Sequence, residues 1–312
     1  MIVNSVAWRG KQGTKAVATS LILGMVVSPI IPSLRALVPP AIFVLLVLAF
    51  VRVDLGAVYS HVRRPWRLAA ATGWTMLACP LIIGLGVSVS GLVEASPDLA
   101  LALMILAVAP PVMSAPAFAY LMGLDGALSL TLLVATMLAT PLSAPLISAL
   151  ILKDALPLEA LALALRLCGL LAGSMAAAWI IRRLAGPARI DASKAIIDGV
   201  NVILLFIFAL AVMDGVLARA ISAPGLVAAL LLLAFAVAVT LLGLTSLLFR
   251  PAGNTQALTL GLSAGCRNMG LMLAALAGHV PDLVWIFIGL AQFPIYFLPW
   301  MLRPLIARPA AT

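Results

Sequence analysis

Long apolar runs recur along the whole chain, and each is bounded by charged residues, proline or glycine. A helix needs about 20 apolar residues to cross a bilayer core, so runs of this length predict membrane-spanning helices. With 64% of its 312 residues hydrophobic and 9% charged, the chain has the composition of a multi-pass membrane protein. We predict an all-α integral membrane protein with ten spans. The spans cover residues 16–31, 36–53, 68–90, 99–121, 126–151, 157–181, 196–217, 223–249, 256–278 and 283–306.

Lysine and arginine gather in alternate loops between these runs. An even number of spans puts both termini on one side, and a cytoplasmic location for them leaves only Arg35, Lys153 and Arg219 outside. The cytoplasmic set is then Arg9, Lys11, Lys15, Arg52, Arg63, Arg64, Arg67, Arg182, Arg183, Arg189, Lys194, Arg250, Arg303 and Arg308. This bias predicts a protein of the plasma (inner) membrane with cytoplasmic termini and a retained first helix. It also accounts for the net charge of +9 without nucleic acid.

Two of the predicted spans are interrupted at matching places in the two halves of the chain. Each half has five spans, an odd number, so residues 1–153 and 154–312 are predicted to form inverted repeats. The fourth span contains Pro110 and Pro111, and the ninth contains the polar stretch 265–270. Proline removes a backbone donor and glycine lets a helix open, so both spans are predicted to be broken. Matching broken helices indicate a transporter site near the bilayer midplane.

Arg267 lies about ten residues from either end of the ninth span, roughly 15 Å along a helix and too deep for its charge to reach water. A charge at this depth costs at least about 2.5 kcal/mol, so a partner, a water-filled cavity or a ligand must compensate it. We predict a binding site formed by Arg267 with its neighbours Ser263, Cys266 and Asn268. An alternative is that Arg267 only ties down the broken backbone by pairing with main-chain carbonyls.

Other ionisable and reactive side chains give weaker indications. Arg166 and Asp214 fall in the outer half of the membrane, and we predict that they form an ion pair. Cys79, Cys168 and Cys266 lie in apolar runs without ligand-like spacing, so neither a disulfide framework nor a metal site is indicated. No set of serine, histidine and acid converges in the sequence, so we predict neither an enzyme nor a cofactor.

Two stretches carry a family resemblance. The first, at residues 109–145, includes A-P-P-V-M-S-A-P, and the second, at 263–273, reads S-A-G-C-R-N-M-G-L-M-L. They resemble the bile acid:sodium symporter family, with matches at Pro110, Tyr120, Leu121, Ala127, Leu128, Ser129, Pro141, Pro145, Gly265 and Asn268. The resemblance implies ten spans in two inverted repeats. It also implies a core of spans 3–5 and 8–10, whose fourth and ninth helices cross at their breaks, and a panel of spans 1, 2, 6 and 7.

The resemblance further implies a substrate site around the two breaks. Carried over position by position, it adds Met113, Ser114 and Pro116 of the fourth span to the site. Thr75 takes the position of a glutamine in the third span of that family. Together with the four residues of the ninth span, these form the predicted substrate-binding set.

This chain departs from the family pattern at the sodium ligands. Ala115 and Pro116 replace a Ser-Asn pair, Ser263 replaces a glutamate and Arg267 replaces a glutamine, while Ser129 is the one plausible remnant. Sodium needs a cage of oxygen ligands, and a fixed guanidinium a few ångströms away repels it. We therefore expect no conventional sodium coupling, with Arg267 either supplying the missing positive charge or pairing with the substrate.

The leading hypothesis is a secondary transporter or facilitator of a small organic anion, a carboxylate, that works by alternating access. One alternative is an arsenite or oxyanion efflux carrier, suggested by Cys266 beside Arg267, although the expected thiol in the fourth span is missing. A membrane sensor and a membrane-embedded enzyme are the non-transport alternatives. The sequence carries no prediction of the oligomeric state.

Overall fold

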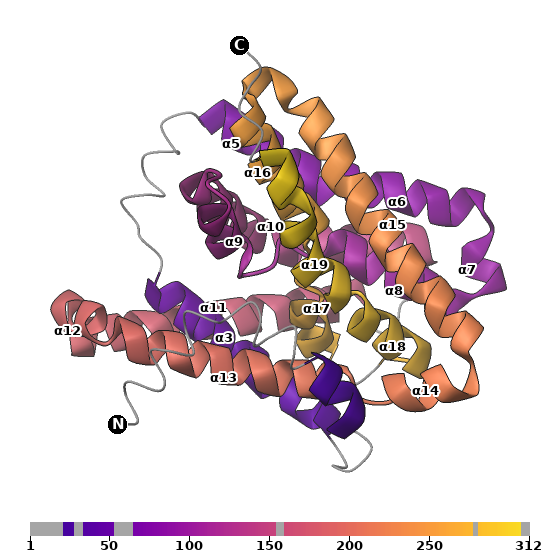
Figure 1. The fold of residues 1–312 in the computed structure, drawn as a ribbon, viewed down its shortest axis with the longest axis horizontal. Coiled ribbons are helices and arrows are strands. Elements are labelled where there is room, and N and C mark those ends of the chain that lie inside the picture. Colours follow the sequence, from indigo (N-terminus) through magenta and orange to yellow (C-terminus); the bar gives the residue numbers. More distant parts are fainter. Residues whose placement is uncertain (1–20, 28–33, 53–64, 154–158, 277–279, 307–312) are drawn as a thin grey trace.

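The computed structural model describes residues 21–27, 34–52, 65–153, 159–276 and 280–306, and within them every regular element is a helix (Figure 1). The elements are η1 (Leu34–Leu37), α3 (Val38–Arg52), α5 (Pro65–Gly73), the π-helix η2 (Trp74–Ala78), α6 (Cys79–Val89), α7 (Leu92–Ala95), α8 (Pro97–Val108), α9 (Ala115–Leu121), α10 (Gly126–Leu152), α11 (Ala160–Ala185), α12 (Pro187–Ala192), α13 (Lys194–Val212), α14 (Val216–Ser222), α15 (Pro224–Leu248), η4 (Arg250–Ala252), α16 (Asn254–Gly265), α17 (Met269–Leu276), α18 (Asp282–Leu290) and α19 (Gln292–Ile306). Residues 21–27 are also helical.

Seven helical stretches in the described part of the chain are long and apolar enough to cross a membrane. They are Leu34–Arg52, Pro65–Val89, Gly126–Leu152, Ala160–Ala185, Lys194–Ser222, Pro224–Leu248 and Asp282–Leu302. Each overlaps one predicted span: the second, third, fifth to eighth and tenth. The predicted class, an all-α membrane protein, is therefore supported, whereas the first predicted span lies mostly outside the described residues.

The two spans predicted to be broken are broken in the structure. The fourth consists of α8 and α9, separated by residues 109–114, and the ninth consists of α16 and α17, separated by residues 266–268. In the first break Ala109 has extended backbone, and the prolines that follow it cannot donate the hydrogen bonds that would continue the helix. Neither half of either span is long enough to cross a bilayer alone.

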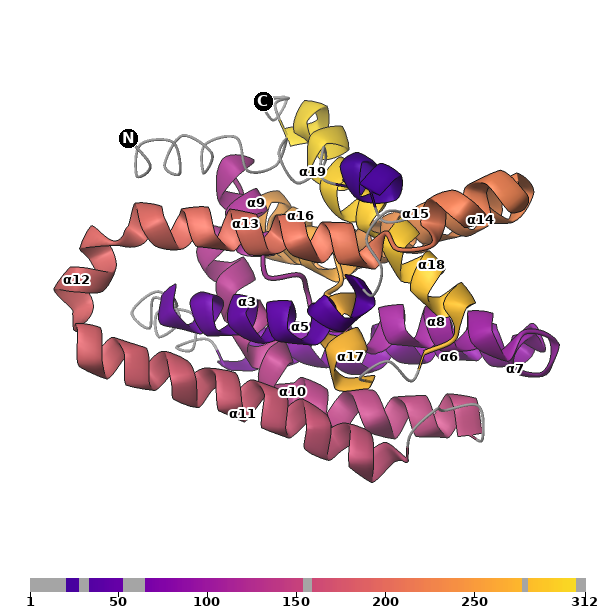
Figure 2. The same cartoon turned by 90° about the horizontal axis from the view of Figure 1, so that it is seen from below.

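Three long helices form one layer of the molecule. Figure 2 shows α3 lying between α11 and α13, and α3 packs against both of them. The remaining spans gather on the other side of this layer, where α15 packs along α16, and α10 packs against α8, α9 and α16. Among the described helices outside this layer, α17, the second half of the ninth span, is the one that packs closely on α3. The layer corresponds to predicted spans 2, 6 and 7.

The start of α10 is fixed by a side-chain cap. The Asp125 carboxylate accepts a hydrogen bond from the backbone N–H of Leu128 at 2.9 Å, which satisfies one of the free donors at the helix N-terminus. The backbone N–H of Asp125 in turn donates to the Thr259 hydroxyl at 3.1 Å. The cap fixes the start of α10, and the bond to Thr259 holds this start against α16.

The predicted orientation in the membrane is tested by labelling of introduced cysteines in a Cys168→Ser background. We expect Lys153→Cys and Arg219→Cys to react with an impermeant maleimide on intact cells, because both follow the sparsely charged outer ends of spans. Arg182→Cys and Arg250→Cys serve as controls and should react only after permeabilisation. Reaction of both pairs from the same side contradicts the predicted topology.

Candidate binding cavity at the crossing of two broken helices

The two breaks meet and are joined by backbone hydrogen bonds. The N–H of Val112 donates to the carbonyl of Cys266 at 2.8 Å, and the N–H of Asn268 donates to the carbonyl of Pro110 at 2.7 Å. Pro111 and Arg267 thereby form an antiparallel bridge. Polar backbone groups freed by one break are thus satisfied by the other, as the interior of a membrane requires.

The Arg267 side chain is fully enclosed, with 1% of its surface exposed, and it donates to main-chain carbonyls. Its Nε donates to Ala264 at 2.7 Å, and its Nη1 donates to Thr75 at 3.1 Å and to Ala109 at 2.9 Å. These carbonyls belong to the ninth, third and fourth spans, so one guanidinium connects three segments distant in sequence. Tying down the broken backbone, which the sequence offered as an alternative role, is part of what Arg267 does.

Local structure explains why the Thr75 carbonyl is free to accept from Arg267. In the π-helix the N–H of Cys79 bonds to the carbonyl of Trp74, so it is not available to Thr75. The next residue in the π register is Pro80, which has no N–H. The side chain of Thr75 is therefore not what the site uses, but its carbonyl is.

The other two carbonyls are released at helix ends. The helix α8 stops at Val108, and the chain leaves Ala109 in an extended conformation, so the Ala109 carbonyl has no helical partner. In a continuous ninth span, the Ala264 carbonyl would accept from the N–H of Asn268, but that N–H bonds to Pro110 instead. Each acceptor of Arg267 is thus created by the local interruption of a helix.

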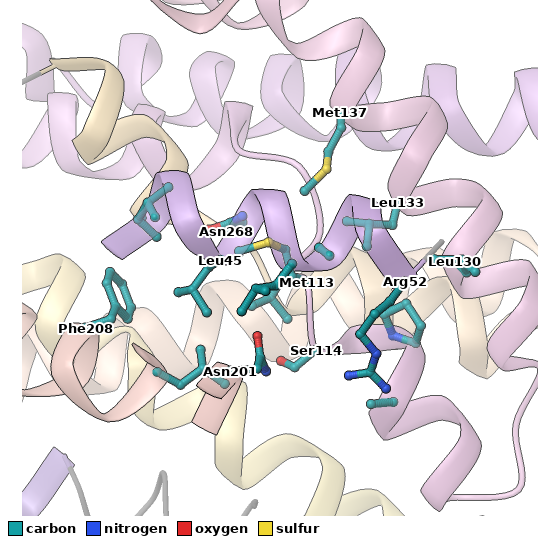
Figure 3. A pocket seen from close by; sticks show the side chains of 18 of the residues that line it. Leu45, Arg52, Met113, Ser114, Leu130, Leu133, Met137, Asn201, Phe208 and Asn268 are labelled. Atoms are coloured by element: carbon teal, nitrogen blue, oxygen red, sulfur yellow. The ribbon is translucent and has the colours of Figure 1, made fainter. Parts of the chain in front are cut away.

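A cavity of about 320 Å³ lies beside the crossing, between α3 and α13 on one side and α9 and α10 on the other. In the view of Figure 3, Phe208 and Arg52 lie at opposite ends of the cavity, with Met113, Ser114 and Asn201 between them. Most of the lining is leucine, methionine, valine and aromatic side chain. Arg52 and Arg267 are the charged residues among the described residues that line it, and Arg52 is paired with Asp198 outside the lining.

Three buried polar atoms of lining residues have no hydrogen-bond partner within the described structure: Ser114 Oγ, Arg267 Nη2 and Asn268 Nδ2. The Asn268 amide is oriented by its oxygen, which accepts from the N–H of Leu271 at 3.3 Å, so its other end is a donor. The thiols of Cys79 and Cys266 lie beside the guanidinium but accept hydrogen bonds only weakly. Buried donors without acceptors are costly, so three of them on residues that line one cavity indicate a place for an acceptor group.

Of the predicted substrate-binding residues, five line the cavity: Met113, Ser114, Pro116, Arg267 and Asn268. The other three, Thr75, Ser263 and Cys266, are buried but do not line it. The Cys266 thiol is 3.9 Å from the carbonyl of Ile295, within the helix packing.

Ser263 and Ser129, which the sequence analysis compared with sodium-site positions, contact each other. Their hydroxyls are 3.1 Å apart, and the Ser263 hydroxyl donates to the carbonyl of Thr259 at 2.9 Å. Both side chains are buried between α10 and α16 and are absent from the lining of the cavity. Their oxygens serve mainly to join these two helices.

Several polar residues of the cavity were missed by sequence reasoning. Asn201 on α13, Gln292 and Tyr296 on α19, and Tyr120 on α9 all line it. Asn201 and Gln292 carry a usable signal, because an amide within an apolar span is costly unless it faces a polar site. The other side chains follow from helix packing, which the sequence pattern does not specify.

The predicted ion pair between Arg166 and Asp214 is wrong. Asp214 accepts from Arg35 Nε at 3.0 Å, while Arg166 is exposed and has a 3.4 Å contact to the carbonyl of Ala275. Arg35 also reaches Asp282 at 2.6 Å. The prediction matched two charges by depth and assigned Arg35 to an outer loop, although Arg35 begins the second span and is held in place there by the packing of η1 against α13.

Comparison with known proteins adds no assignment to this geometry. A scan against protein-family models found no match, and no curated protein sequence matches the chain.

Proposed function

We propose that this protein is a secondary transporter or facilitator of a small organic anion, and that the substrate occupies the cavity beside the crossing. The observation that carries the proposal is a set of three unpartnered buried atoms, Ser114 Oγ, Arg267 Nη2 and Asn268 Nδ2, each of which belongs to a residue that lines that cavity. All three can donate, and two arginines but no carboxylate occur among the described lining residues. A carboxylate has the complementary charge and up to four acceptor sites.

The rest of the cavity supports an organic rather than an inorganic anion. A volume of about 320 Å³ lies at the lower end of the range for small-molecule sites, and it exceeds what a single oxyanion fills. Its walls are mainly apolar, with Leu45, Met137 and Phe208 among them. The alternative of arsenite or oxyanion efflux needs a smaller, more polar site, and the Cys266 thiol, which suggested it, does not line this cavity.

Transport also needs access to the site from one side of the membrane at a time. Three of the described cavity-lining residues are exposed, Arg52, Ala117 and Tyr120, and Tyr120 has 62% of its surface accessible. Arg52 lies at the predicted cytoplasmic end of the second span. We propose a ten-span protein of two inverted repeats, similar in plan to the bile acid:sodium symporters, whose cavity opens to the cytoplasm in this conformation and whose cycle does not use conventional sodium coupling.

The proposal is tested with purified protein, a thermal-shift panel of small carboxylates and flux measurements in liposomes. We expect at least one carboxylate to raise the melting temperature and to be carried across the bilayer. Ser114→Ala and Asn268→Leu each remove one donor to a charged group and should weaken binding about tenfold.

Ser174→Ala is the matched control, because Ser174 is a buried serine whose hydroxyl bonds within its own helix at Leu171. It should bind the same carboxylate as the wild type does. Stabilisation by oxyanions but by no carboxylate favours the efflux alternative. Binding without flux favours a sensor, and equal binding by all variants contradicts the assignment of the cavity.

A further inference from the structure

The acceptors around Arg267 form a cage of main-chain oxygens. The carbonyls of Thr75, Ala109 and Ala264 come from three separate segments and lie 2.7 to 3.1 Å from guanidinium nitrogens. Within the described residues, no acidic side chain contacts the guanidinium. A positive charge surrounded by carbonyl oxygens has the environment of a bound cation, and here the cation is part of the protein.

We propose that the Arg267 guanidinium is a built-in cation in a site assembled from these carbonyls, and that the site binds a guanidinium ion from solution when the side chain is removed. The inference rests on the geometry of the crossing and not on the proposed transport function. Its ligand class is a small planar cation with several N–H donors.

The cage exists independently of the arginine, because each carbonyl is freed by its own segment. Thr75 is released by the π-helix and Pro80, Ala109 by the end of α8, and Ala264 by the end of α16. Truncation of Arg267 therefore leaves three buried acceptors that no neighbouring N–H can satisfy. Such a site gains the most from an ion that restores the same donors.

A guanidinium fits the cage better than an ammonium does. Arg267 serves three acceptors with two of its nitrogens, because the planar fork directs N–H groups along fixed and divergent directions. The lysine ammonium is a single point of charge at the end of a flexible stem, and it cannot place donors at all three of these oxygens in the directions that the guanidinium does. Because the Arg267 guanidinium already occupies the site, we expect the wild-type crossing to bind no cation from solution.

The test compares the wild type with Arg267→Ala in detergent at constant ionic strength, with low-millimolar guanidinium chloride replacing sodium or potassium chloride. We expect the variant to melt at least about 5 °C lower than the wild type, since several hydrogen bonds to a charge are lost. Guanidinium should recover part of that loss in a saturable manner, as binding to the folded state requires. The wild type should show no change with guanidinium, sodium or potassium.

Arg166→Ala is the matched control, because Arg166 contacts a single main-chain carbonyl and is exposed, so guanidinium should not stabilise this variant. If Arg267→Ala does not yield folded protein, the melting temperature of Arg267→Lys and its response to guanidinium test the proposal instead. It should fold with a lower melting temperature than the wild type and gain nothing from guanidinium. A lysine variant as stable as the wild type overturns the proposal, as does a folded Arg267→Ala protein without a guanidinium response or a wild type stabilised by sodium. Because these readouts measure stability, they are independent of whether the protein transports anything.

Discussion

Replacement of Gly261 by leucine is expected to abolish the accumulation of folded protein. A Cβ atom at Gly261 would lie 2.7 Å from the carbonyl oxygen of Leu242 and closer still to the Ser246 hydroxyl, both on α15. Gly265, one turn further along α16, meets the carbonyl of Ala238 in the same way at 2.8 Å. Small residues let two helix backbones approach closely in a membrane, and a large side chain between them forces the helices apart. Overpacking typically costs about 1 to 3 kcal/mol, and contact with backbone rather than a flexible side chain puts this case at the upper end.

Gly243→Leu is the control for this substitution, because Gly243 lies on α15 and a Cβ there meets nothing within 4 Å. Size-exclusion chromatography of a fluorescent fusion measures both variants. Gly243→Leu should elute like the wild type, whereas Gly261→Leu should appear as aggregate or disappear. A monodisperse Gly261→Leu protein with an unchanged melting temperature would show that α15 and α16 do not approach this closely.

The second large effect is expected from Arg35→Glu. Arg35 contacts Asp214 at 3.0 Å and Asp282 at 2.6 Å, and its guanidinium lies 5.0 Å from the centre of the Trp285 ring. The substitution removes both ion pairs and the cation–π contact and places three carboxylates together. Because the cluster is partly exposed, we expect a loss of about 1 to 3 kcal/mol, seen as a melting temperature several degrees lower.

Arg219→Glu makes the same change of charge at another exposed arginine, on α14, and should have little effect. Combining Arg35→Glu with Asp214→Arg restores one pair of opposite sign and should recover part of the loss. Among single neutralisations, Asp214→Asn should cost more than Asp282→Asn, since the Asp282 side chain is 80% exposed. Equal melting temperatures for Arg35→Glu and Arg219→Glu would remove the cluster as a source of stability.

The membrane class and the two broken spans could be predicted because they follow from local properties of the chain. An apolar run of span length favours a membrane helix, and adjacent prolines such as Pro110 and Pro111 interrupt a helix, whatever the rest of the chain does. The burial of Arg267 was predictable for the same reason, because depth in a span can be counted along the sequence. The prediction that the two breaks meet came from the family resemblance and not from periodicity.

The way the helices pack against one another could not be predicted from the sequence. Nearly every face of a membrane helix is apolar, so the pattern does not distinguish the side that faces lipid from the side that faces a cavity. The sequence therefore did not predict that Asn201 and Phe208 on α13 line the cavity, or that Arg35 is the partner of Asp214. The role of Thr75 was hidden for a further reason, since its contribution is a backbone carbonyl released by a π-helix.

The union of the two breaks also constrains how the protein is made. The carbonyl of Ala109 accepts from Arg267, which lies 158 residues later in the chain. At about 5 to 20 residues per second, the ribosome needs roughly 10 to 30 seconds to synthesise that interval. During this time the backbone N–H and C=O groups of the break in the fourth span have no partner from the ninth span. The break must therefore stay where water or the insertion machinery can form hydrogen bonds with these groups. Completion of the ninth span is thus the event that allows the fourth to settle fully into the bilayer.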